Sequence, residues 1–209
     1  ITPRAMRNGI IVTVLFACLI GSALLFYAGW ELTIVGLLCV LFAFLYTTGP
    51  YPLSYNGWGD VLVIVFFGFV PVGGTYYVQA LTWTSDTTVA SLICGLLIDT
   101  LLVVNNYRDR EADARSGKRT VIVRFGEKFG RYLYLMLGVA ASLLCFWFFF
   151  EGHLFAALLP LLYLIPHVLT WRRMVQIHSG KKLNSILGET SRNMLLMGIL
   201  LSIGFLIRH

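Results

Sequence analysis

Long apolar segments, separated by short polar stretches, make up most of this chain. Seven of them reach or approach the ~20 residues that an α-helix needs to cross the hydrocarbon core of a bilayer. They are continuous and lack the period-two alternation of membrane β-strands. We therefore predict an all-α, polytopic transmembrane helical bundle forming one domain, with spans at Asn8–Gly29, Leu32–Gly49, Asp60–Val78, Thr87–Asn106, Arg131–Phe150, Leu154–Trp171 and Asn193–Ile207.

The composition agrees with a membrane bundle. Hydrophobic residues make up 58% of the chain and charged residues only 12%, whereas soluble domains carry about 25% charged residues. In the third span, Gly68, Gly73 and Gly74 are small enough to allow close packing of neighbouring helices. The four cysteines lie singly in apolar segments, which indicates neither a zinc site nor a disulfide framework.

The basic residues are distributed unequally between the two sides of the predicted bundle. Fifteen of the 16 lysines and arginines fall on the side of the N-terminus and of the loops at 47–60, 107–130 and 172–192. Arg208 is the only one on the other side. Lysine and arginine are retained on the cytoplasmic face, so we expect the first side to be cytoplasmic. This topology accounts for the net charge of +6 without a nucleic-acid partner.

Two carboxylates follow the fourth span at a helical spacing. Asp109 and Asp113 are four residues apart, and Asn105 lies one turn earlier, so a helix would present all three on one face. Carboxylate and amide oxygens are the ligands that Mg²⁺ prefers, and phosphate oxygens commonly complete its shell. The basic residues that a bound diphosphate requires come directly afterwards, as Arg115, Lys118 and Arg119.

Two other interpretations of acidic residues stay open at this point. The pair could belong to a solvated loop in which Asp109 forms local ion pairs with Arg108 or Arg115. Asp99 lies in the middle of a span, where a carboxylate is costly and marks a candidate functional site. It either lines a cavity or has a structural role, in which it is protonated or accepts a hydrogen bond from a Ser or Thr on a neighbouring helix.

The motif N-N-Y-R-D-R-E-A-D-A-R-S-G-K-R-T-V-I-V-R-F-G, which starts at Asn105, resembles the second aspartate-rich motif of the UbiA-type intramembrane prenyltransferases. Within that family, it is most similar to the branch that prenylates 1,4-dihydroxy-2-naphthoate in menaquinone synthesis. Residues 49–79 resemble the corresponding helix of the same branch. The resemblance implies a bacterial inner-membrane enzyme with nine spans, a central cavity and its active-site loops on the cytoplasmic face.

The resemblance also implies a reaction and a set of site residues. A polyprenyl group would pass from its diphosphate to the naphthoate, with loss of CO₂, to give demethylmenaquinone. Asp109 and Asp113 would be the catalytic pair that holds Mg²⁺ and diphosphate, with Asn105 or Asn106 supporting them. Lys118 and Arg119 would neutralise the leaving diphosphate.

The chain departs from the family pattern in two places. The first aspartate motif, of the type N-D-x-x-D, does not occur in residues 1–209, and the chain begins with Ile1 rather than Met. We therefore expect a fragment that lacks the first two helices, its seven spans being the third to the ninth. Some relatives carry a Tyr-x-x-x-Lys pair. Here Tyr46, a candidate residue of the substrate cavity, has Pro50 rather than lysine four residues later.

Other residues are candidates for the substrate cavity, and other functions remain as alternatives. We expect an allylic cation to need aromatic faces, for which Tyr76 and Tyr77 are candidates, and an acceptor to need polar groups such as Asn56 and Gln79. A different aromatic acceptor is one alternative function. A membrane transporter is another and would explain Asp99, but not a loop that combines D-x-x-x-D with G-K-R-T.

Overall fold

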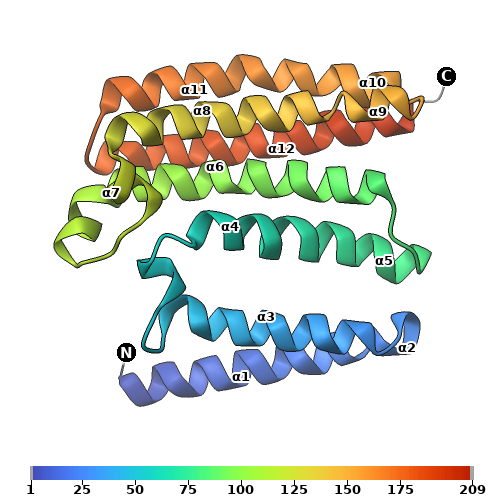
Figure 1. The fold of residues 1–209 in the computed structure, drawn as a ribbon, viewed down its shortest axis with the longest axis horizontal. Coiled ribbons are helices and arrows are strands. Elements are labelled where there is room, and N and C mark those ends of the chain that lie inside the picture. Colours follow the sequence, from blue (N-terminus) through green and yellow to red (C-terminus); the bar gives the residue numbers. More distant parts are fainter. Residues whose placement is uncertain (1, 208–209) are drawn as a thin grey trace.

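The computed structural model describes residues 2–207, and every regular element in that range is helical (Figure 1). The elements, in chain order, are α1 Pro3–Ser22, α2 Leu25–Ala28, α3 Glu31–Thr47, η1 Leu53–Tyr55, α4 Gly59–Val63, the π-helical η2 Ile64–Gly73, α5 Gly74–Ala80, α6 Ser85–Arg115, α7 Val121–Phe125, α8 Glu127–Leu144, α9 Trp147–Phe150, α10 Leu154–Leu158, the 3₁₀ segment η3 Leu159–Tyr163, α11 Leu164–Ile177, η4 Lys181–Leu183 and α12 Asn184–Leu206.

These elements, all within residues 2–207, form seven helical segments that run alongside one another (Figure 1). Within this range, six helical stretches are long and apolar enough to span a membrane, from Pro3–Ala28 to Lys181–Leu206. The seventh, α3, has 17 residues, and at 1.5 Å per residue it is about 26 Å long, close to the ~30 Å of a hydrocarbon core. The two termini lie at opposite ends of the helices, as an odd number of crossings requires (Figure 1). The predicted all-helical membrane bundle is confirmed.

Two helices run well past the ends that hydropathy predicted. The fourth predicted span ends at Asn106, but α6 continues to Arg115. The seventh predicted span begins at Asn193, but α12 begins at Asn184. Charged side chains end a hydropathy window, but the backbone hydrogen bonds of a helix do not depend on apolar side chains. The helix extensions therefore carry polar residues beyond the predicted apolar spans.

Helix α6 lies at the centre of the fold. It packs against η2 on one side and α8 on another, and together with α8, α10–α11 and α12 it forms a four-helix group (Figure 1). The backbones of η2 and α6 approach closely where Gly68 faces Gly95, and a Cβ on Gly68 would lie 2.5 Å from the Ser91 carbonyl oxygen. Gly73 similarly lies against Trp83, whereas Gly74 has no atom within 4 Å of its Cβ position. The expectation of close helix packing is thus correct for Gly68. Gly73 instead contacts the Trp83 side chain in the α5–α6 connection, and the expectation is wrong for Gly74.

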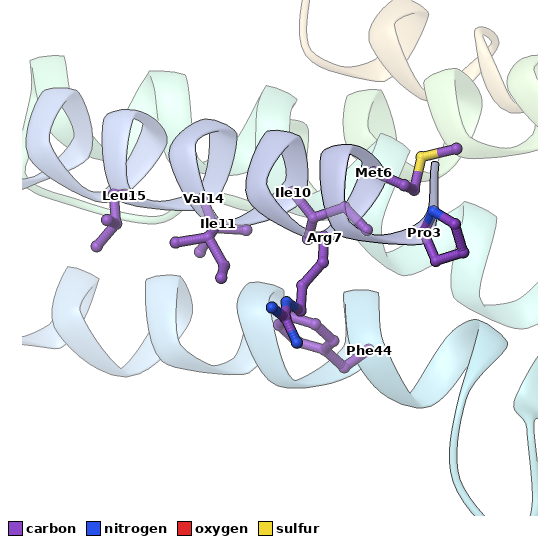
Figure 2. Close-up of a pocket in the computed structure, with 8 residues that line it drawn as sticks. All are labelled: Pro3, Met6, Arg7, Ile10, Ile11, Val14, Leu15 and Phe44. Atoms are coloured by element: carbon purple, nitrogen blue, oxygen red, sulfur yellow. The ribbon is translucent and has the colours of Figure 1, made fainter. Parts of the chain in front are cut away.

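Helices α1 and α3 form the outer layer and bury little surface. No residue of α1 is buried, and an open apolar groove of about 510 Å³ separates it from α3. In Figure 2 the apolar side chains of α1 line this groove, and Arg7 extends toward Phe44 of α3 near one end. A helix that is apolar and unburied needs lipid or other helices around it, which is consistent with a membrane environment.

The polar loops gather at one end of the bundle. The N-terminal end of α1, the 48–58 segment, the α6–α7 connection and the α11–α12 connection all lie at this end (Figure 1). The fifteen basic residues that the sequence assigned to one side lie in these segments or in the adjoining turns of α6, α7, α8, α11 and α12. Arg208, assigned to the other side, lies outside the described residues. The structure therefore places the basic loops together, at the end where α6 carries its acidic stripe.

Candidate active site

The acidic stripe lies on the last turns of α6 and is extended by the loop that follows. Because α6 is continuous to Arg115, Asn105, Asp109 and Asp113 follow one another at single-turn intervals. Gly117, with a φ of +77°, reverses the chain after the helix, and the Lys118 amide donates to the Asp113 carbonyl at 2.9 Å. This turn brings the Lys118 Nζ to 3.5 Å from Asp113 Oδ2. A cation predicted to bind diphosphate thus lies beside one of the predicted metal ligands.

Arg108 connects the stripe to a distant helix. Its guanidinium donates to both carboxylate oxygens of Asp109, at 2.8 and 2.6 Å, and to Asn105 Oδ1 at 2.7 Å. It also donates to Asn184 Oδ1, at the start of α12, at 2.9 Å. The ion pair with Asp109 agrees with the local pairing that the sequence left open. The sequence gave no sign of the contact with Asn184, which is 76 residues away.

The 51–58 segment packs against the loop after α6 and closes one side of the site. The Arg119 amide donates to the Tyr55 carbonyl at 2.8 Å, and Arg124 Nη2 donates to the Asn56 carbonyl at 2.7 Å. Between them, Gly57 has a φ of +81°, and a Cβ at this position would lie 3.0 Å from the Arg119 carbonyl oxygen. Glycine therefore satisfies both the turn and the close approach here.

A small polar cleft forms where these segments meet. It brings together three predicted site residues, Tyr46, Asn106 and Lys118, although they come from three separate parts of the chain. Asn106 is buried at 4% exposure. Sequence analysis missed the other polar residues of the cleft, which are Ser54, Asp60 and Thr120. Asp60 could have been predicted from the sequence, because it is an acidic residue at the start of an apolar span, close behind the 51–58 segment.

Asp99 lies deeper in the bundle than this cleft. It is 1% exposed, and its Oδ1 atom has no hydrogen-bond partner among the described residues. It lies within electrostatic range of Asp60, and both carboxylates lie within electrostatic range of Tyr46. The predicted hydrogen bond from a neighbouring hydroxyl group is therefore not found for Oδ1. Asp99 instead belongs to a polar group that extends from the cleft into the membrane-spanning part.

The remaining predicted residues are placed differently. Arg115 and Arg119 are exposed at the rim of the basic loop. The Asn56 side chain donates to the Pro52 carbonyl at 2.8 Å and stabilises the 51–58 segment. Tyr76, Tyr77 and Gln79 lie on α5, at the opposite end of the bundle from α7 (Figure 1). The structure therefore does not bring these three together with the acidic stripe.

Comparison with known proteins identifies the family. The sequence profile of the UbiA prenyltransferase family matches residues 1–203. The chain belongs to this family. It is 36% identical to the 1,4-dihydroxy-2-naphthoate octaprenyltransferase of Haemophilus influenzae, over 99% of this chain and 70% of that protein. No solved structure matches the chain significantly.

Two further relatives of this UbiA-family chain are also named 1,4-dihydroxy-2-naphthoate octaprenyltransferase. The Escherichia coli K12 protein is 38% identical over 69% of this chain, and the Mycobacterium leprae protein is 39% identical over 68%. These matches span about half of each relative, 49% and 48%. The prediction of a UbiA-type prenyltransferase enzyme embedded in a membrane is confirmed, and the transporter alternative loses its support.

UbiA prenyltransferases typically depend on a metal ion, so the fit of the stripe to a hard cation can be tested. In the described part of the chain, no group of three or more His, Cys, Asp or Glu side chains is arranged to hold a metal. The stripe does supply two carboxylates and one amide oxygen on one helix face. Asp113 Oδ2 is buried and accepts no hydrogen bond from the described residues, although Lys118 Nζ lies 3.5 Å from it. The oxygen atoms of the stripe therefore fit part of a Mg²⁺ site. Phosphate oxygens of a bound substrate would complete the coordination of the ion.

Proposed function

We propose that the protein transfers a polyprenyl group from polyprenyl diphosphate to 1,4-dihydroxy-2-naphthoate, at the cytoplasmic face of the bacterial inner membrane. The observation that carries this proposal is the juxtaposition of Asp113 with Lys118 beside Asn105 and Asp109, at the membrane-proximal end of α6. A diphosphate bound there would leave its hydrocarbon tail among apolar helices. The names of the relatives supply the acceptor.

The reaction breaks the bond between the first prenyl carbon and the diphosphate oxygen and forms a bond from that carbon to the aromatic ring. The ring carboxylate leaves as CO₂, and diphosphate leaves with the electron pair of the broken bond. Bound Mg²⁺ would neutralise charge on the departing diphosphate. Asn105, Asp109 and Asp113 would hold the ion.

The chain's own cations would assist the departure of diphosphate. The Lys118 ammonium group lies 3.5 Å from the Asp113 carboxylate. With metal and diphosphate bound, this ammonium group would contact the diphosphate and stabilise its negative charge. Arg108 contacts the same oxygens of Asn105 and Asp109 that the metal would use. If these oxygens held the metal, the Arg108 guanidinium would be free to pair with the diphosphate.

Substitution of the two acids in the full-length protein tests the proposal. We expect Asp109→Asn and Asp113→Asn each to lower Mg²⁺-dependent prenyl transfer by on the order of 10²- to 10³-fold, the loss that removal of one charge-stabilising group commonly causes. The matched control is Glu111→Gln, which removes an exposed carboxylate from the same helix segment. Purified variants are assayed in vesicles with octaprenyl diphosphate and the naphthoate. Full activity in both aspartate variants would show that the stripe is not the metal site.

A further inference from the structure

A second open groove lies between α11 and α12, away from the acidic stripe. Its volume is about 560 Å³, and none of its lining residues belongs to the site described above. Helix α11 forms one outer edge of the four-helix group (Figure 1). The groove opens to the outside of the bundle, because Leu169, Arg172 and Arg192 among its lining residues are exposed. Its lining residues are Pro166, Leu169, Thr170, Arg172, Arg173, Gln176, Glu189, Arg192 and Asn193.

The groove carries an excess of positive charge. Arg173 forms an ion pair with Glu189 at 2.6 Å, and the Glu189 side chain is only 12% exposed. Arg172 and Arg192 line the same groove and are exposed, and neither has an ion pair with another described residue. Two guanidinium groups are therefore available to an anion, and a guanidinium matches the geometry of a phosphate better than an ammonium group does.

The position of these arginines relative to the membrane restricts the anion. Arg172 directly follows the predicted span Leu154–Trp171, and Arg192 directly precedes the predicted span Asn193–Ile207. Both therefore lie at the level of the lipid headgroups. Within the predicted apolar span, the groove is lined by Pro166 and by Leu169, which is 54% exposed.

The floor of the groove is formed by a buried polar contact. Asn193 Nδ2 donates to Thr170 Oγ1 at 2.9 Å, which joins α12 to α11 within the bundle. Both side chains are nearly fully buried, at 8% and 3% exposure. This hydrogen bond fixes the spacing of the two helices that carry the arginines.

We propose that this groove binds the headgroup of an anionic phospholipid. The phosphate would lie between Arg172 and Arg192, and an acyl chain would lie along Leu169. Basic pockets between transmembrane helices on the cytoplasmic side recognise anionic headgroups by the same combination of charge and depth. The proposal does not depend on the reaction assigned to the acidic stripe.

Lipid titration of the full-length protein tests this site directly. The protein in non-ionic detergent is titrated with phosphatidylglycerol or with phosphatidylcholine of the same acyl chains, and bound lipid is counted by native mass spectrometry. We expect a preference for phosphatidylglycerol in the unmodified protein. The double variant Arg172→Gln/Arg192→Gln should bind it at least about tenfold more weakly, because each charge-assisted contact to phosphate contributes on the order of tenfold in affinity.

The matched control is Lys181→Gln/Lys182→Gln, which removes two exposed positive charges from the α11–α12 connection, outside the groove. Its affinity for phosphatidylglycerol should stay within about twofold of the unmodified protein, since neither lysine touches the groove. Equal loss in both double variants, or no loss in the arginine variant, would overturn the proposal.

Two further measurements keep the result interpretable. Inorganic phosphate at millimolar concentration should not displace the lipid, and displacement would show that the groove binds free phosphate instead. The melting temperature of each variant without added lipid reports whether it is folded. If the arginine double variant does not fold, the single variant Arg192→Gln takes its place, and an affinity unchanged from the unmodified protein would refute the assignment.

Discussion

The crossing of η2 and α6 gives the sharpest quantitative test of the fold. A Cβ on Gly68 would lie 2.5 Å from the Ser91 carbonyl oxygen and 2.8 Å from the Gly95 Cα. Carbon and oxygen in contact are normally about 3.3 Å apart, so Gly68→Ala requires a shift of nearly 1 Å. The atoms in the way belong to the backbone of α6, so no flexible side chain can move aside.

We expect Gly68→Ala to lower the free energy of unfolding by about 1–3 kcal/mol, the cost of inserting a methyl group into a well-packed contact. The control is Gly74→Ala, six residues further along, where nothing lies within 4 Å of the new Cβ. That variant should be neutral or more stable by up to about 1 kcal/mol, because alanine is the better helix former.

The measurement is an equilibrium unfolding titration of each full-length variant in detergent micelles, followed by circular dichroism. Both substitutions replace glycine by alanine in one continuous helical segment, so helix propensity affects them alike. The difference between the two free energies therefore isolates the steric contact. If the two variants differ by less than about 0.5 kcal/mol, the backbones of η2 and α6 are not as close as the structure shows.

Two other substitutions test single carboxylates by the same unfolding titration. Glu127 accepts hydrogen bonds from the Tyr107 hydroxyl at 2.9 Å and from Arg110 and Arg131, and its Oε1 atom lies 3.0 Å from His178 Nε2. Glu127→Gln should therefore destabilise the protein by about 1–2 kcal/mol, and less at high salt; no change at low salt would contradict the network. Asp99→Asn should leave stability unchanged or raise it, because a buried carboxylate oxygen without a partner is costly. A loss above about 1 kcal/mol would show that the Asp99 carboxylate makes a stabilising contact.

The sequence predicted local features of the candidate site and not the contacts between segments. The stripe of Asn105, Asp109 and Asp113 depends only on helical periodicity, and the structure shows all three on one continuous helix. The cleft that joins Tyr46 to Lys118 depends on how the 51–58 segment packs against the loop after α6. No periodicity in the sequence encodes that contact.

Residue type alone also did not predict which residues lie together in the candidate site. Tyr76, Tyr77 and Gln79 are of suitable type for a substrate cavity, but α5 ends at the opposite side of the bundle from the stripe (Figure 1). Arg108 could be paired with Asp109 from sequence, since the two are adjacent. Its bond to Asn184 requires the relative placement of α6 and α12, which only packing sets.

The sequence by itself determined that this protein is a membrane helical bundle with its basic loops on one side and an acidic stripe at the end of one helix. Those properties follow from hydrophobic transfer and from the 3.6-residue helical period, which act on neighbouring residues. Tertiary structure decided which loops meet around the stripe, where helix backbones touch, and that two arginines share a groove between α11 and α12. These features depend on side-chain volume and on contacts between residues far apart in the chain, which a local sequence pattern does not predict.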